Sequence, residues 1–135
     1  MIALPTYLQG PRVLAIAREH FGCDALDGVE IENQPTSNGA CWGSHWEERL
    51  FKTEFMSAIV DVGSSYSALT LGFFEDSGWY KANYSHVQHL AWGYKKGCGF
   101  AQGPCLGAPK ANPVPSDPEH FCSINGQEGT KNPIY

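Results

Sequence analysis

The chain has 135 residues, of which 42% are hydrophobic and 17% charged, so its composition excludes intrinsic disorder and suggests one domain or parts of two. The net charge is −5 and the sequence has no basic stripe, which excludes a nucleic-acid partner as a working hypothesis. Gly (15) and Pro (9) are plentiful and aromatic residues make up 13%, a composition typical of a loop-rich globular protein with short elements.

The first helix is predicted over residues 11–21. Pro11 suits the first helical position, and Gly22 suits the left-handed residue that follows a last turn. Apolar residues recur at helical spacing, which predicts a single buried face. That face consists of Val13, Leu14, Ala17 and Phe21.

Short elements and loops are expected to alternate after this helix. Residues 24–32 predict a short extended segment, residues 34–43 a polar loop, and residues 44–55 a short helical turn. Residues 67–77 predict a second helix, and irregular segments rich in aromatic residues follow it. The buried side of this helix is predicted to be Leu69, Phe73 and Phe74. Gly, Pro, Asn and Ser dominate residues 103–118, which predicts a domain boundary or a long loop.

Five cysteines are scattered along the chain, namely Cys23, Cys41, Cys98, Cys105 and Cys122. None of them has the CxxC spacing of a zinc knuckle or a redox motif, so structural disulfides formed in an oxidising compartment are expected. The odd number leaves at least one thiol unpaired or paired outside this chain. No signal peptide, transmembrane segment or lipid-anchor motif is visible, so we expect the chain to be a piece of a longer protein.

His45 and Met56 are candidates for a metal site. His45 lies in the run GSHWEER, whose small residues let the backbone approach closely, and Met56 follows eleven residues later. A lone histidine is seldom a ligand, because zinc needs three or four converging groups, and a lone methionine usually fills a core. In metzincins, however, a tight turn places a methionine beneath the zinc ion soon after the third histidine ligand.

The run SHWEERLFKTEFM resembles the signature that joins the third zinc histidine of leishmanolysin-type metallopeptidases to their Met-turn. Flanking stretches between residues 10 and 105 resemble the same family, namely REHFGCDALDGVEIEN, LTLGFFEDSGWYKANYS and LAWGYKKGCGFAQGPC. The resemblance implies that His45 is the third zinc ligand and that Met56 is the Met-turn methionine.

The resemblance also implies a pairing of the cysteines. Cys23 and Cys98 would form one disulfide. Cys105 would pair with a later cysteine, for which Cys122 is the only candidate in this chain. Cys41 departs from the family pattern and is expected to be the odd one out.

The HExxH motif, which supplies the first two zinc histidines and the general-base glutamate of metzincins, is absent from this sequence. His86 and His89 are three residues apart rather than four and lack that glutamate, so we expect them to be surface histidines. Glu47, Glu48 and Glu54 are expected to lie on a solvated helical face rather than to act as substitute bases.

Four further residues have simpler interpretations. His20 lies near the end of the first predicted helix, where the helix dipole favours it. His120, in the Pro-rich tail, is expected to be exposed. Asn83 begins the triplet Asn-Tyr-Ser, which fits N-glycosylation but is a weak signal because such triplets are common. Tyr66 is expected to be a packing residue.

The resemblance implies an α+β, irregular, loop-rich, disulfide-stabilised fold. Residues 1–103 would be the central portion of a leishmanolysin-like peptidase, and residues 104–135 the start of its C-terminal domain. The implied function is Zn²⁺-dependent cleavage of protein or peptide substrates at the cell surface or after secretion. The N-terminal catalytic half of the peptidase and any membrane association would come from parts not in this chain.

With one ligand and no base, the isolated chain is expected to be inactive. One alternative is a non-enzymatic surface adhesion or decoy module that has lost its active site. Another is a small disulfide-stabilised secreted protein with an unrelated binding role.

Overall fold

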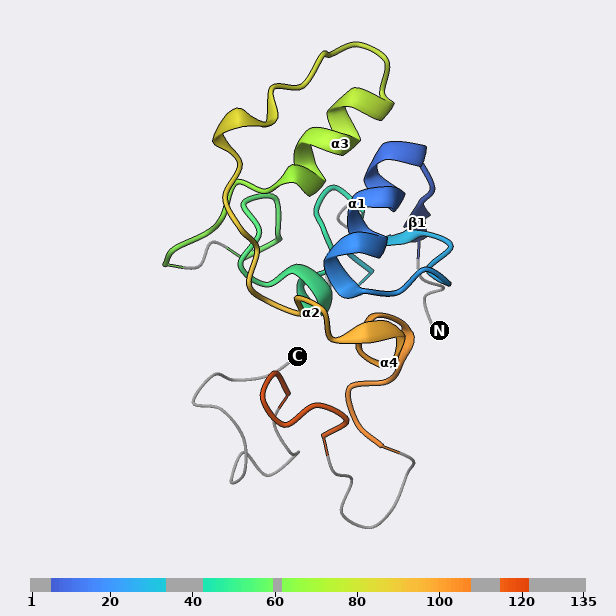
Figure 1. Ribbon diagram of the computed structural model, residues 1–135. Helices are drawn as coiled ribbons and strands as arrows, with labels where there is room; N and C mark the ends of the chain where they lie inside the picture. Colours follow the sequence, from blue (N-terminus) through green and yellow to red (C-terminus); the bar gives the residue numbers. More distant parts are fainter. Residues whose placement is uncertain (1–5, 34–42, 60–61, 108–114, 122–135) are drawn as a thin grey trace, which may run out of the picture.

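The computed structural model describes residues 6–33, 43–59, 62–107 and 115–121. These segments form short helices and one two-stranded sheet (Figure 1), which confirms the predicted α+β, irregular, disulfide-stabilised class. The elements in chain order are β1 (Thr6–Leu8), α1 (Pro11–Phe21), β2 (Val29–Ile31), α2 (Glu48–Phe51), α3 (Ala68–Asp76), the 3₁₀ turn η1 (Tyr84–His86) and α4 (Gly97–Gln102). Every helix in these segments is too short or too polar to span a bilayer.

Helix α1 has the boundaries that the sequence predicts, because both of its ends carry local signals. Pro11 begins the helix, and Gly22 ends it in the left-handed conformation with φ 68°. The carboxylate of Asp76, the last residue of α3, accepts hydrogen bonds from the backbone N–H groups of Arg12 at 3.0 Å and Val13 at 2.8 Å. Asp76 thereby satisfies two unpaired donors at the start of α1 and joins the two helices.

Helices α1 and α3 pack against each other (Figure 1), and Gly72 permits their close approach. A Cβ atom added at Gly72 would lie only 2.7 Å from the Cδ1 atom of Ile16. The buried residues of α3 are therefore Leu69, Thr70, Leu71 and Gly72. The prediction that Phe73 and Phe74 are buried is wrong, because the glycine contact turns them away from α1. Phe73 is 38% exposed, and Phe74 is partly exposed.

Strand β1 pairs with β2 in antiparallel register, with Tyr7 opposite Glu30. Two isolated bridges extend this sheet, because Ile31 pairs with Trp46 and Trp46 pairs with Ser57. The extended segment predicted over residues 24–32 is thus realised in its second half. Strand β1 was not predicted, because three residues are too few to show an alternating pattern and the partner strand follows only after α1.

Helix α4 was also not predicted, since Gly97 and Gly99 are poor helix formers. Tertiary contacts hold it instead. Phe100 is 5% exposed and stacks on Phe121 with ring centroids 5.3 Å apart. Cys98 anchors the first turn through a disulfide. Packing therefore overrides a weak local preference.

Most of the buried hydrophobic residues of the described segments form one core cluster. Its members are Val13, Ala17, Phe21, Cys23, Leu26, Val29, Ile31, Trp46, Leu50, Phe51, Leu69, Leu90, Phe100, Ala101 and Phe121. Trp46 is 4% exposed, and its ring contacts that of Phe51 at a centroid distance of 5.8 Å. Burial of Trp46 fixes the backbone of its neighbour His45 relative to the core.

Candidate functional site

His45 lies in an extended segment that is hydrogen-bonded on both sides. On one side, the Glu32 N–H group donates to the carbonyl of His45 at 2.9 Å. On the other side, the Trp46 N–H group donates to the carbonyl of Met56 at 3.0 Å. The two residues that the sequence separates by eleven positions therefore lie on neighbouring stretches of backbone.

The imidazole of His45 is held at one ring nitrogen. Its Nδ1 atom lies 2.8 Å from the Oε2 atom of Glu32 and 3.1 Å from the Oγ atom of Ser44. Within the described segments, Nε2 has no hydrogen-bond partner. The side chain is 41% exposed and lines a cavity of about 210 Å³ together with Trp46 and Met56. One ring nitrogen thus remains available beside a largely apolar cavity.

Met56 is half-buried against the hydrophobic core, and its turn is fixed through the backbone. Its N–H group donates to the Oε2 atom of Glu54 at 2.5 Å. The Glu54 N–H group donates to the Phe51 carbonyl at 2.8 Å, and the Ser57 N–H group donates to the Glu54 carbonyl at 3.1 Å. These bonds set the shape of the turn without using the thioether.

Glu54 has a fully buried side chain with an exposed fraction of 0%. Its Oε1 atom accepts hydrogen bonds from the hydroxyl groups of Ser67 and Thr70, both at 2.7 Å. Ser67 is the N-cap of α3, and the Oγ1 atom of Thr70 accepts a hydrogen bond from the indole N–H of Trp46 at 2.9 Å. One carboxylate therefore connects the turn at Met56, the start of α3 and the residue next to His45.

The prediction that Glu47, Glu48 and Glu54 lie on a solvated face is wrong. Their exposed fractions are 3%, 3% and 0%. Helix α2 is a single turn that is joined to α4, because the guanidinium group of Arg49 donates to the Phe100 carbonyl at 3.0 Å. Burial raises the pKa of Glu47, whose side chain caps α2 by accepting a hydrogen bond from the Arg49 N–H group.

The other candidate residues of this region lie on the surface. His86 and His89 are both exposed, as the sequence predicts. Asn83 is exposed, and its side chain accepts a hydrogen bond from the Ser85 N–H group at 3.0 Å, while its glycosylation stays a prediction. Tyr66 is 40% exposed and packs edge-on against the ring of Phe55.

His120 was predicted to be exposed, and this is wrong, because its ring packs against Phe100 at a centroid distance of 4.9 Å. Its side chain is 9% exposed. Asp117, Glu119 and His120 are the one group of three ligand-type side chains in the described segments whose donor atoms lie within 4.8 Å of one another. The ammonium group of Lys96 lies 3.3 Å from Asp117 and is also hydrogen-bonded to Glu119, so both carboxylates are already paired with a cation.

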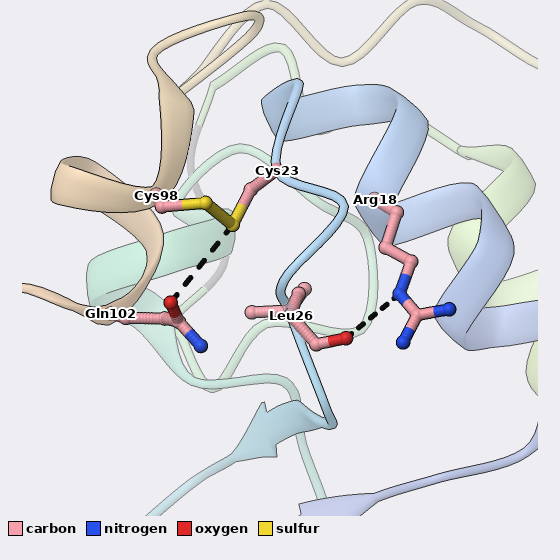
Figure 2. The surroundings of a disulfide bond; sticks show 5 residues. All are labelled: Arg18, Cys23, Leu26, Cys98 and Gln102. Carbon is pink, nitrogen blue, oxygen red and sulfur yellow. Dashed lines mark hydrogen bonds between the residues drawn. A yellow bond between two sulfur atoms is a disulfide. The ribbon is translucent and has the colours of Figure 1, made fainter.

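The Cys23–Cys98 disulfide is present, which confirms the expected pairing (Figure 2). It joins the residue after the cap of α1 to the first turn of α4. Cys105 is half-buried, and burial raises the pKa of its thiol. Its expected partner Cys122 lies outside the described residues, as does Cys41, so the Cys105–Cys122 pair stays a prediction.

The donor chemistry at His45 fits one position of a zinc site. A neutral imidazole nitrogen is a preferred zinc donor, and a carboxylate on the opposite ring nitrogen is common around metal-bound histidines. Zinc needs three or four such donors. The group around Asp117 does not include His45, and the sequence has no HExxH motif. Within the described residues, His45 therefore offers one nitrogen that fits a zinc site, together with the surface around it.

Comparisons with known proteins find similarity over most of the chain. The family model described as leishmanolysin matches residues 4–131. A leishmanolysin-like peptidase of Caenorhabditis elegans is 44% identical over 95 residues, which cover 70% of this chain and 14% of that protein. A leishmanolysin homolog of Crithidia fasciculata is 43% identical over 99 residues, which cover 73% of this chain and 15% of that protein.

The leishmanolysin of Leishmania donovani is 36% identical over 112 residues, which cover 83% of this chain and 18% of that protein. The chain thus spans between 14% and 18% of the length of these three relatives.

Proposed function

Since this chain belongs to the leishmanolysin family of metallopeptidases, we propose that it is part of a zinc-dependent endopeptidase that hydrolyses peptide bonds in proteins. The observation that carries this proposal is the position of His45 beside the turn at Met56, with Nδ1 held by Glu32 and Nε2 available. A bound zinc ion supplies Lewis-acid activation of a peptide carbonyl and of water.

In this proposal, His45 would be one of three zinc ligands and Met56 would form the floor of the site. The buried hydrogen bonds of Glu54 hold that floor at a fixed distance from the His45 segment. The residues that line the cavity of about 210 Å³ beside His45 form part of the surface that faces the substrate. The remaining ligands and the general base belong to an HExxH motif, which this sequence does not contain.

The isolated chain is therefore expected to be inactive, because one imidazole cannot hold zinc tightly. A cleavage assay on the purified chain, with added Zn²⁺ and an unfolded protein substrate, tests this. Turnover that a chelator abolishes would contradict the assignment of catalytic groups to residues outside this sequence.

The proposed activity is tested by extending the chain. The genomic sequence upstream of the codon for Met1 is read for an in-frame HExxH motif, and the extended protein is expressed. We expect this protein to bind zinc and to cleave protein substrates, and His45→Ala to remove both properties. His86→Ala changes an exposed histidine and serves as the control.

A second candidate function is a non-enzymatic surface adhesion or decoy module, in which the same fold persists without a complete active site. The upstream sequence distinguishes the two candidates. A promoter directly before Met1 would support the module, whereas an in-frame HExxH would support the enzyme. Both proposals place the protein at the cell surface or in the secreted fraction.

A further inference from the structure

We propose that Glu32 is a positioning residue that holds the His45 imidazole as the Nδ1–H tautomer and thereby presents its Nε2 atom to the zinc ion. This inference rests on the proposed function for the role of His45 as a ligand. The contact between the two side chains, and the protonation state that it imposes, are properties of this chain alone.

The contact is close and partly shielded from water. The Oε2 atom of Glu32 lies 2.8 Å from Nδ1 of His45, and the Glu32 side chain is 17% exposed. The Oγ atom of Ser44 lies farther from the same nitrogen, at 3.1 Å. A hydroxyl group can donate or accept, so Ser44 is compatible with either tautomer.

The carboxylate is not compatible with both tautomers. An ionised carboxylate only accepts hydrogen bonds, so the proton of the contact must lie on Nδ1 of His45. A neutral imidazole has one proton, and Nε2 then carries a free lone pair. Since Nε2 has no hydrogen-bond partner within the described segments, this lone pair is available to a metal ion. An imidazole without such a partner favours the opposite tautomer in water.

The backbone fixes the contact in direction. Glu32 directly follows β2, and its N–H group donates to the carbonyl of His45 at 2.9 Å. The adjacent pair, Ile31 and Trp46, forms a bridge of the extended sheet. The two side chains therefore start from paired backbone positions. This pairing limits the rotation of the ring, whereas the carboxylate contact sets the tautomer.

Orientation, rather than stability, is the expected contribution of this contact. Because the imidazole is 41% exposed, solvent screens the pair, and exposed ion pairs contribute little to stability. A carboxylate that orients a metal-bound histidine, in contrast, changes metal affinity about 10–100-fold. The two roles can be separated experimentally.

The test uses the 135-residue chain, labelled with ¹⁵N, without metal and at a pH well above the usual histidine pKa of about 6.5. Long-range ¹H–¹⁵N correlation spectra report which nitrogen of His45 is protonated. We expect the Nδ1–H tautomer in the wild type and a shift toward Nε2–H in Glu32→Ala. Glu32→Gln should restore the wild-type tautomer in part, because its amide oxygen can still accept the hydrogen bond. Glu19→Gln, at an exposed position of α1, should behave as the wild type.

The Nε2–H tautomer in the wild type, or an unchanged tautomer in Glu32→Ala, would overturn the proposal. The dispersion of the amide spectrum shows whether each variant is folded. If Glu32→Ala does not fold, the comparison between Glu32→Gln and the wild type decides the outcome, because a weaker acceptor should increase the Nε2–H population.

Zinc chloride is then added to each protein, and the Nε2 resonance of His45 is followed. We expect a zinc-dependent shift in the wild type whose apparent affinity falls about 10–100-fold in Glu32→Ala. Equal affinities would overturn the role of Glu32 in presenting Nε2. Because one imidazole binds zinc only weakly, the titration extends to a large excess of zinc. A wild type with the Nδ1–H tautomer whose Nε2 does not respond even there would leave the Glu32 contact standing and contradict the ligand role of His45 in the proposed function.

Discussion

The backbone N–H group of Met56 donates a hydrogen bond of 2.5 Å to the carboxylate of Glu54, a side chain with no exposed surface. A buried acidic residue therefore holds the methionine turn. The same carboxylate accepts from the hydroxyl groups of Ser67 and Thr70, so the turn cannot shift without disturbing the start of α3. The geometry around His45 depends on this buried polar cluster as much as on hydrophobic packing.

Replacement of this carboxylate should destabilise the whole fold. In Glu54→Gln, the NH₂ group either faces the Met56 N–H group or replaces the oxygen that both hydroxyl groups share, in which case both hydroxyl donors lose their acceptor. Hydrogen bonds to charged groups contribute about 1.5–3 kcal/mol each, so we expect a loss of about 2–4 kcal/mol in the free energy of unfolding. Urea denaturation measures this loss. The matched control is Glu19→Gln at an exposed position, expected to lie within about 0.5 kcal/mol of the wild type. Equal unfolding midpoints for the two variants would contradict the role of Glu54.

The Cys23–Cys98 disulfide should be a major source of stability. It closes a loop with a sequence separation of 75 residues, for which the chain-entropy model gives about 4 kcal/mol. We expect the double variant Cys23→Ala/Cys98→Ala to lose an amount of this order in urea denaturation. Peptide mapping of the oxidised wild type should recover Cys23 linked to Cys98. Cys23 linked to any other cysteine would contradict the observed pairing.

Gly93 should tolerate no side chain, because two constraints act on it together. Its φ angle is +72°, and an added Cβ atom would lie 2.6 Å from Phe100 and 2.9 Å from Phe21. Backbone strain of about 1–2 kcal/mol and overpacking of about 1–3 kcal/mol should add in Gly93→Ala.

Gly78 provides the matched control for this experiment. Its φ angle is +75°, and an added Cβ atom would meet nothing within 4 Å, so Gly78→Ala carries the backbone strain alone. Thermal or urea unfolding should therefore show a clearly lower free energy of unfolding for Gly93→Ala than for Gly78→Ala. Equal losses in the two variants would show that the aromatic rings near Gly93 can move aside.

His20 should make stability depend on pH. In the folded chain, burial lowers the pKa of its imidazole below the ordinary value of 6.5. The Nε2 atom lies 2.9 Å from the Trp92 carbonyl, to which it can donate a hydrogen bond. The unfolded chain thus binds a proton more readily, so stability falls as the pH drops through 6.5 toward the lower folded pKa. Above 6.5 the contribution is fully present.

The variant His20→Gln removes this titrating group and should flatten the fall in stability between about pH 7.5 and 5. Urea denaturation at a series of pH values, with and without the substitution, gives the difference between the two curves. If both proteins lose stability in parallel over this range, the buried imidazole of His20 is not responsible for the fall.

Local signals in the sequence predicted those elements whose ends they mark. The boundaries of α1 follow from Pro11 and Gly22, and α3 begins within the predicted range, where the structure shows Ser67 as its N-cap. The buried side of α3 was predicted wrongly, because the close approach at Gly72 is a property of the helix pair and not of the helix. Helix α4 has poor helix formers and exists through its packing and its disulfide.

The candidate site was predictable only where it follows a family pattern. His45 and Met56 were identified from the resemblance of their surroundings to a known signature. Glu32 and Glu54 carried no signal, because a glutamate in a polar stretch usually lies in water. Their roles depend on partners that the chain brings together only after folding, thirteen residues away for Glu32 and up to sixteen for Glu54.

The Cys23–Cys98 bond encloses His45 and Met56 in a covalent ring. Trp79, which is 86% exposed, lies within the same ring and offers proteases an accessible site. A single cut there would leave both pieces attached to each other as long as the disulfide is oxidised. Resistance to fragmentation would then depend on the redox state of the surroundings, and a nicked molecule would lose one half only after reduction.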